Sequence, residues 1–487
     1  MNTTFNRVIS VSFVGRFLAQ IQIAVFGLAV ASLLSKQDFG LFQQLLSFSL
    51  IAVTVARLGF EIVAQIEIPK KDGIALIDGL SIDLIKIKII GSLVVGPIIL
   101  LLLQFFSFPN LGSQFTLLIV VYSFLLAVNR YVIDAVMVYS LRITRAILIS
   151  NVLAFFKLCA VGYLIFIASN SIQPIISALV FVELGCFVYL MFFYKVVNKD
   201  FLQLNLQSFT QENIKHASHQ YGDVLLSTMV SMAGGVLVLS LFGDLELLAS
   251  YTFILAVVMG IFSGGSLNSI LEPIMNTLLL RRLNLSSNDF DQAEIDQILG
   301  VWCSLSFIVN LFIGLCLFIL MGTINEYFLD YKYSSEVPKI FMVYIGLSAF
   351  CWTYQYSTWA LLKKRLDILR NASLVTGVAH YLFIGLFTYF YGVNGALWSL
   401  ILSHIIKCYL VHMYLGKPTF LAKAFQITLG QIWSVLLILI MIGISFLYLD
   451  SDYKYFIYFA TISVSAFTTF NVYKTYNEIY LNKLRTQ

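Results

Sequence analysis

The stretch VTVARLGFEIVAQ, from Val53 to Gln65, places an arginine and a glutamate inside an otherwise apolar run. The run covers about residues 40–66, which is longer than the roughly 20 apolar residues that a helix needs to cross a bilayer. Arg57 and Glu61 are four residues apart, so we expect them on one face of that helix. A charge near the membrane centre costs roughly 2.5–3.5 kcal/mol and marks a paired or functional site.

The composition of the whole chain is that of a membrane protein. Of the 487 residues, 60% are hydrophobic and 11% are charged, whereas a soluble domain is about half apolar and a quarter charged. Runs long enough to cross a bilayer lie at about 8–33, 40–66, 84–106, 114–140, 147–168, 172–194, 222–242, 249–279, 298–322, 339–362, 368–391, 395–414, 427–449 and 455–473. We therefore predict an all-α polytopic membrane protein with about 14 transmembrane helices.

Lys and Arg are distributed unevenly between the two sides of the predicted membrane. Of the 30 such residues, five lie within spans, and four lie in loops on one side: Lys36, Lys332, Lys339 and Lys454. The others, including Lys86 and Lys88 at the start of the third span, lie on the opposite side. Cytoplasmic loops carry the excess of positive charge, so both termini are predicted to be cytoplasmic. The net charge of +5 follows from this bias and gives no reason to expect nucleic acid as a partner.

Two weak internal matches divide the spans into two groups of six. RAILISN at 145–151 resembles RLDILRN at 365–371, and KQDFGLF at 36–42 corresponds in position to LELLASY at 245–251. Both groups start on the same side, which predicts parallel repeats related by an axis along the membrane normal. The predicted domains are an N-terminal lobe (1–200), a cytoplasmic interfacial linker (201–221), a C-terminal lobe (222–416), and two accessory spans with a cytoplasmic tail (417–487).

Three segments resemble a known family. They are LSKQDFGLFQQLLSFSLI at 34–51, ARLGFE at 56–61 and the Gly-rich YGVNGALWSLILSHII at 391–406. Together they are similar to the polysaccharide-transporter branch, which contains the O-antigen and capsule repeat-unit flippases, of the multidrug/oligosaccharidyl-lipid/polysaccharide (MOP) flippase superfamily. The resemblance covers the whole chain. One departure is Arg57, because many relatives have an acidic or neutral residue near this position.

The resemblance implies a two-lobed, V-shaped transporter with a cavity between the lobes. Members of this branch move undecaprenyl-pyrophosphate-linked oligosaccharide repeat units from the cytoplasmic to the periplasmic leaflet of the bacterial inner membrane. The expected partners are this substrate, membrane lipids, and a polysaccharide polymerase with its chain-length regulator. We expect no covalent chemistry and no cofactor, with coupling to a proton or sodium gradient.

The charges within the spans are the candidate site residues. For pyrophosphate binding we select the cations Arg16, Arg57, Arg130 and Lys157, since arginine binds phosphate oxygens bidentately and stays protonated. For ion coupling or charge balance we select the acids Glu61, Asp134, Glu183 and Glu272. The alternative is structural: Arg57–Glu61 and Arg130–Asp134 can be satisfied pairs between packed helices, and the other two acids can form packing hydrogen bonds.

Three further features of the sequence carry expectations of their own. Gly260, Gly264, Gly265 and Pro273 interrupt the eighth span and provide either a hinge or close helix packing. Asp223 is expected to cap the seventh span at its positive dipole end. The six cysteines lie in predicted spans without a CxxC pair and imply no disulfide or metal role.

Other functions compete with the flippase hypothesis. A polytopic polysaccharide polymerase or ligase would act on the same lipid-linked substrate, but it usually has a large external loop with His or Arg, which this sequence lacks. A multidrug cation exporter of the same superfamily is expected to place acids in its cavity. A lipid II flippase has a similar mechanism and the same span count.

Overall fold

The computed structural model describes residues 2–57, 59–68, 74–106, 113–140, 142–167, 171–196, 211–265, 292–348, 356, 359–360, 365–415, 419–447 and 454–476. In the first half the helices are α1 (Asn2–Leu33), α2 (Lys36–Val55), α3 (Phe60–Glu67), α4 (Ile74–Ser92), α5 (Val95–Phe105), α6 (Ser113–Tyr131), η1 (Val132–Met137), α7 (Ile143–Phe166) and α8 (Ile172–Phe193). In the second half they are α9 (Gln211–Met229), α10 (Met232–Ser240), α11 (Leu245–Gly265), α13 (Gln292–Tyr327), α14 (Val337–Ser348), α16 (Leu366–Tyr414), α17 (Phe420–Gly430), α18 (Ile432–Leu447) and α19 (Lys454–Tyr476).

The helices are those of a polytopic membrane protein. Within the described ranges there is no strand, and eight helices are long and apolar enough to cross a membrane. The number rises to ten if each of two bent helix pairs forms one span. The predicted all-α fold class is thus confirmed, whereas the count of 14 stays a prediction.

Several predicted spans are not single straight helices. The second span is divided into α2 and α3, and the fourth ends in a turn of π-helix, η1. The thirteenth corresponds to α17 and α18, which are bent by 69° relative to each other. Spans eleven and twelve form the single element α16, which is kinked at Gly392 (φ 56°, ψ −137°). Only glycine adopts such angles readily, so the turn between these two spans depends on that residue.

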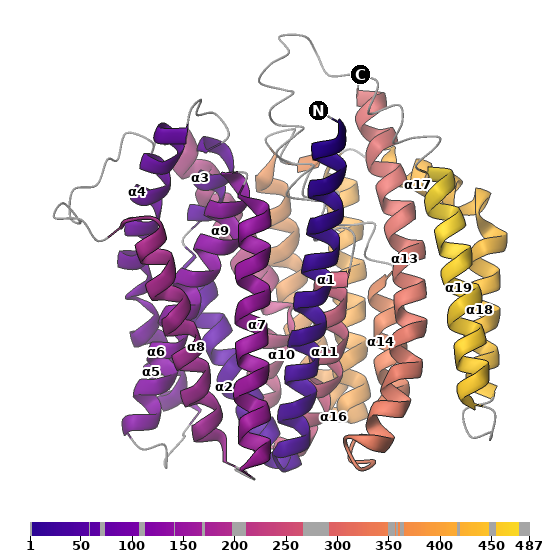
Figure 1. Cartoon of the computed structure of the whole chain (residues 1–487), viewed down its shortest axis with the longest axis horizontal. Helices are drawn as coiled ribbons and strands as arrows, with labels where there is room; N and C mark the ends of the chain where they lie inside the picture. Colours follow the sequence, from indigo (N-terminus) through magenta and orange to yellow (C-terminus); the bar gives the residue numbers. More distant parts are fainter. Residues whose placement is uncertain are drawn as a thin grey trace.

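The two halves of the chain form two groups of helices that lie side by side (Figure 1). In Figure 1, α3 to α8 lie to the left and α13 to α19 to the right, while α9 of the second half lies on the left beside α3. Helix α1 packs on α7 of its own half and on α11 of the other, and α2 packs on both α10 and α11. Helix α2 is mostly buried. It therefore runs along the interface between the two lobes.

The first turns of α2 and α11 are both capped by a side chain at matching positions of the internal repeat. Ser35 caps α2 through the amide of Asp38, and Asp244 accepts hydrogen bonds from two amides in the first turn of α11. The side chains of Gln37 and Glu246, which are 209 residues apart, contact each other at 3.5 Å. Ser35 and Asp244, which the weak sequence match makes equivalent, thus both cap a helix. Gln37 and Glu246, also equivalent, meet at the lobe interface.

The last helices form a separate unit beside α13, at the right edge of Figure 1. Helix α17 packs along α13, where the Asp296 carboxylate accepts hydrogen bonds from Trp359 Nε1 at 3.2 Å and from the Thr419 hydroxyl. Ser304 and Thr428 are joined at 2.9 Å. These polar contacts start before the predicted thirteenth span, so the accessory unit is attached to the C-terminal lobe by α17.

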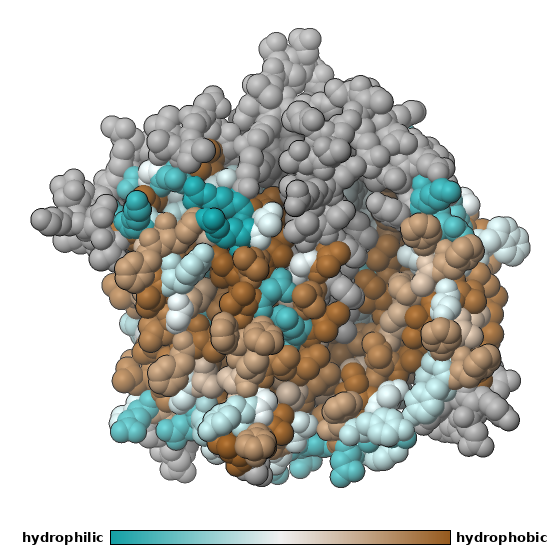
Figure 2. Space-filling model, viewed as in Figure 1, coloured by the Kyte–Doolittle hydropathy of each residue, from teal (hydrophilic) through white to brown (hydrophobic). Residues whose placement is uncertain are grey.

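The surface matches a membrane environment. Figure 2 shows a broad apolar band across the middle of the molecule, with hydrophilic groups above and below it. A hydrophilic patch interrupts this band where α7 and α1 lie side by side. At this contact the Asn151 amide donates to the carbonyl of Gly15 at 2.8 Å. The band places the two ends of the bundle on opposite sides of the membrane.

The ends of the bundle make the predicted orientation testable. The background is a variant of the protein without its native cysteines. In intact cells, we expect Tyr331→Cys, in the turn between α13 and α14, to react with a membrane-impermeant maleimide. Arg365→Cys, an exposed residue before α16, should react only after permeabilisation. The reverse pattern would place the termini outside the cytoplasm.

Candidate functional site

The second predicted span is broken at its charged segment. Helix α2 ends at Val55, and α3 begins after Gly59, whose φ of 72° lies in the left-handed region. Arg57 Nε lies 3.4 Å from Glu61 Oε1, and about a third of each side chain is exposed (32% and 27%). The expected pair therefore exists, but it bridges a break between two helices. The expectation of one continuous helical face is wrong because Gly59 turns the backbone.

A third charge, Lys88, is buried at the same break. Its Nζ donates to the carbonyl of Ala56 at 2.6 Å and lies 5.5 Å from the ring centre of Tyr131, and the residue is only 1% exposed. The last carbonyls of a helix lack helical partners and carry a partial negative charge. Lys88 satisfies one of them at the end of α2.

Helix α9, which packs on α16, also contacts the break. The Tyr221 hydroxyl on α9 donates to the carbonyl of Val55 at 3.0 Å. Thr228 and Thr54 approach each other at 3.5 Å, and α3 packs against α9. The end of α2 thus receives one hydrogen bond from Lys88 on α4 and one from Tyr221 on α9, so both halves of the chain contribute. A movement of α9 away from α2 would leave the Val55 carbonyl without this partner.

The sequence analysis counted Lys88 among the cytoplasmic charges at the start of the third span and therefore missed its role at the break. Lys86 and Lys88 occur in the stretch LIKIKII at 84–90, where both side chains are buried. A lysine inside an apolar run at the start of a span is also what a membrane-interface lysine looks like. Only the contact with Ala56, 32 residues away, separates the two cases.

Lys157 and Glu183 form a largely buried ion pair in the N-terminal lobe. Lys157 Nζ on α7 lies 2.5 Å from Glu183 Oε1 on α8, and the Glu183 side chain is 2% exposed. The Asn129 amide on α6 donates to Glu183 Oε2 at 2.7 Å. Both carboxylate oxygens therefore have partners. The sequence analysis placed Lys157 among the cations for pyrophosphate binding and Glu183 among the acids for ion coupling or charge balance, and the structure joins the two in one ion pair.

The remaining candidates are less tightly placed. Arg130 and Asp134 both have exposed side chains, and the π-helix η1 begins between them, which changes the α-helical spacing on which their expected pairing depended. The side chain of Arg16 lies outside the described residues, as do Glu272 and Pro273. Helix α11 continues through the glycines expected to form a hinge, Gly260, Gly264 and Gly265.

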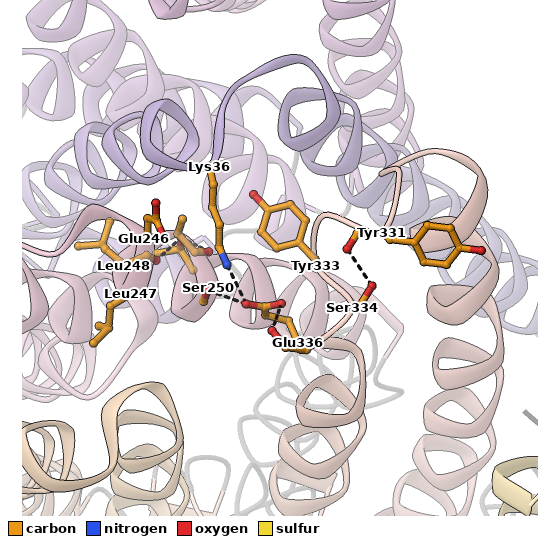
Figure 3. A network of polar contacts seen from close by, with 12 residues as sticks. Lys36, Glu246, Leu247, Leu248, Ser250, Tyr331, Tyr333, Ser334 and Glu336 are labelled. Carbon is orange, nitrogen blue, oxygen red and sulfur yellow. Dashed lines mark hydrogen bonds and ion pairs between the residues drawn. The ribbon is translucent and has the colours of Figure 1, made fainter.

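A polar cluster joins the lobes at the other end of α2 (Figure 3). Lys36 Nζ lies 3.1 Å from Glu336 Oε1, and Ser250 Oγ donates to the same oxygen at 2.7 Å. The rings of Tyr333 and Phe253 stack at 3.9 Å. We call these five residues the outer clasp. It binds the N-terminal lobe to α11 and to the turn before α14.

A second lysine ties the same turn to α1. Lys332 Nζ donates to the carbonyl of Ala31 at 2.8 Å and to the carbonyl of Leu34. These carbonyls lie at the end of α1, where the helix dipole is negative. Two of the four lysines assigned to this side, Lys36 and Lys332, therefore serve contacts between the lobes, which the sequence analysis did not anticipate.

Comparison with known proteins gives similarity at the level of structure. No protein-family model and no curated protein sequence matches this chain. A crystal structure of MATE in the straight conformation has a TM-score of 0.57 at 13% identity and covers 84% of this chain and 94% of its own. The lipid II flippase MurJ in the inward closed conformation has a TM-score of 0.54 at 14% identity, with coverages of 96% and 98%. The chain has the fold of these transporters.

A third structure names the larger group. It is a multidrug resistance MATE family transporter of the MOP superfamily in its outward-facing conformation, with a TM-score of 0.50 at 13% identity and coverages of 84% and 94%. The transporter fold expected from the sequence resemblance is thus confirmed, since the chain shares the fold of these three structures. Similarity to the MurJ structure extends over a larger share of this chain than similarity to the two MATE structures.

The Lys157–Glu183 pair makes a prediction about stability. Removing one partner of a buried pair costs about 3–5 kcal/mol, because the other charge stays buried without compensation. We expect Lys157→Met to lower the thermal stability of the purified protein strongly and Lys157→Met/Glu183→Gln to recover most of the loss. The exposed Arg365–Asp367 pair is the control, since Arg365→Ala should cost less than about 1 kcal/mol. Equal effects of Lys157→Met and Arg365→Ala would contradict the assignment.

The outer clasp makes a prediction about pH. Burial by itself raises the pKa of Glu336, but hydrogen bonds from Ser250, Ser335 and Lys36, with the charge of Lys36, hold it below 4.5. The stabilisation is therefore complete above pH 4.5 and is lost as the pH falls through the lower folded-state pKa. Thermal unfolding should show wild type more stable than Glu336→Gln at pH 7, with a gap that closes at low pH. A gap independent of pH would contradict this role of the charge.

Proposed function

We propose that the protein is a flippase for undecaprenyl-pyrophosphate-linked oligosaccharide repeat units. In this proposal it moves them from the cytoplasmic to the periplasmic leaflet of the bacterial inner membrane by alternating access, and the repeat units serve O-antigen or capsule synthesis. One observation carries the proposal: two cations lie at the helix break between α2 and α3, Arg57 paired with Glu61 and Lys88 bonded to the carbonyl of Ala56.

The chemistry of the break suits a diphosphate. Arg57 is held by Glu61 at 3.4 Å with about a third of its side chain exposed, so its planar fork has donors left for a ligand. In the proposed cycle, pyrophosphate oxygens replace the Glu61 carboxylate on Arg57, an exchange that preserves charge-assisted hydrogen bonds. Lys88 adds a fixed positive charge beside them. A cationic drug would gain nothing from this surplus.

The position of the break links binding to movement. Tyr221 and Thr228 lie on α9, which packs against α16 of the C-terminal lobe, and they contact the end of α2. A substrate that binds Arg57 therefore acts on a contact between the two halves of the chain. The opposite end of α2 is held by the outer clasp. Alternating access then requires these two sets of contacts to open in turn, with Gly260, Gly264 and Gly265 of α11 as the proposed hinge.

The comparisons give this proposal general support and also favour a second candidate. The similar structures are transporters, and the MurJ structure covers 96% of this chain. A lipid II flippase is therefore the alternative, because lipid II also joins a polyprenyl chain to a glycan through pyrophosphate. The polymerase and the chain-length regulator remain proposed partners.

Genetic complementation distinguishes these functions. We expect deletion to strand single lipid-linked repeat units on the cytoplasmic face and wild type to restore surface glycan. At matched membrane levels, Arg57→Ala should reduce export about ten- to a hundredfold, because a hydrogen bond to a charged group is worth about 1.5–3 kcal/mol. Arg57→Lys should rescue in part, and the exposed control Arg365→Ala fully.

Other outcomes would redirect the proposal. Accumulation of lipid II after deletion would support the alternative flippase. Repeat units that reach the periplasm but remain unpolymerised would indicate a polymerase. Full rescue by Arg57→Ala would show that the Arg57–Glu61 pair is structural.

A further inference from the structure

A second carboxylate, largely buried in the C-terminal lobe, contacts two serine hydroxyls and one lysine. Asp223 lies well inside α9, so its expected role as a helix cap is wrong. Its Oδ1 accepts a hydrogen bond from the Ser373 hydroxyl of α16 and lies 3.3 Å from Ser227 Oγ. Lys407, near the other end of α16, places Nζ 2.6 Å from Ser227 Oγ and 3.3 Å from Asp223 Oδ1.

The oxygen atoms of this cluster are those that bind a hard cation. One carboxylate and two hydroxyls, from Asp223, Ser227 and Ser373, converge from two helices, and the serine oxygens are 3.2 Å apart. Hard cations such as Na⁺ prefer oxygen ligands of this kind. The Lys407 ammonium is itself a compact, strongly hydrated point charge. It stands where such an ion would be held.

The Lys407–Asp223 pair differs from an ordinary surface ion pair because both side chains are largely buried. The side chains of Lys407 and Asp223 are only 27% and 18% exposed, so the carboxylate needs a nearby positive charge. The N-terminal lobe neutralises Glu183 in the same way, with Lys157 and a neutral polar side chain. Both lobes thus balance a buried acid with a cation that belongs to the chain.

We propose that Asp223, Ser227 and Ser373 form a monovalent-cation site whose occupant is the tethered ammonium of Lys407. The wild-type protein then binds no sodium ion at this site, and the C-terminal lobe keeps its charge balance without a dissociable metal ion. Removal of the lysine amine creates a sodium site. The inference refines the coupling of the proposed transporter but does not depend on its substrate.

The neighbouring cation Arg370 offers a matched control. Its Nη1 donates to His219 Nδ1 at 2.8 Å, and its aliphatic stem packs against Gly222, beside Asp223. It therefore contributes positive charge near the cluster, but its recorded hydrogen bonds go to His219 and Asn371. If only local charge mattered, Arg370→Ala would have the same effect as loss of Lys407.

The experiment measures ²²Na⁺ binding to purified protein in nanodiscs, in choline buffer. We expect no saturable binding to wild type or Arg370→Ala, and about one Na⁺ per chain for Lys407→Ala. Lys407→Ala/Asp223→Asn should lose this binding. In a background without native cysteines, Lys407→Cys should also bind Na⁺, and aminoethylation, which restores a lysine-like amine, should abolish it.

Two results would overturn the inference. The first is saturable Na⁺ binding by wild type that Asp223→Asn removes, because the site would then hold a free ion. The second is absence of Na⁺ binding in folded, monodisperse Lys407→Ala and Lys407→Cys. Since binding is measured on the protein alone, these results do not depend on whether the substrate proposal succeeds or fails.

Discussion

A helix that breaks inside a membrane must find partners for its backbone within the protein, because lipid offers none. Here the break lies between α2 and α3, and the chain supplies Lys88 from α4 and Tyr221 from α9. Much of the remaining structure follows from this need. The lysine has to be buried to reach Ala56, and the tyrosine requires α9 to lie against the end of α2. The contact between the lobes is therefore part of what stabilises the break.

The charges in the membrane region differ in how firmly they are held, and this difference separates their roles. Glu183 has both carboxylate oxygens occupied and is almost completely buried, so an exchange of partners there would cost several kcal/mol. The Arg57–Glu61 contact is longer and partly exposed. A ligand can compete for it at little cost. The N-terminal lobe thus contains one pair suited to structure and one suited to binding.

The sequence predicted what depends on local pattern. Apolar runs of sufficient length identified the helices, and the i, i+4 spacing identified the Arg57–Glu61 pair. Three features could not be found in this way. Lys88 contacts Ala56 from 32 residues away, Lys157 contacts Glu183 from 26, and Lys407 contacts Asp223 from 184. Such partners are chosen by tertiary packing, which periodicity does not record. The break at Gly59 had a local signal, a glycine within a charged segment of the span, that the continuous apolar run concealed.

The decisive measurement is substrate movement by the purified protein in proteoliposomes. A fluorescent polyprenyl-pyrophosphate oligosaccharide would be placed in the inner leaflet, and its exposure outside would be followed with an impermeant quencher. The proposed function predicts that wild type moves this lipid. It also predicts that wild type leaves a matched polyprenyl glycan without phosphate in place, because Arg57 and Lys88 then have no anion to bind. Equal movement of both lipids would contradict a phosphate-binding role for the break between α2 and α3. Failure of folded, monodisperse protein to move either lipid would contradict it as well.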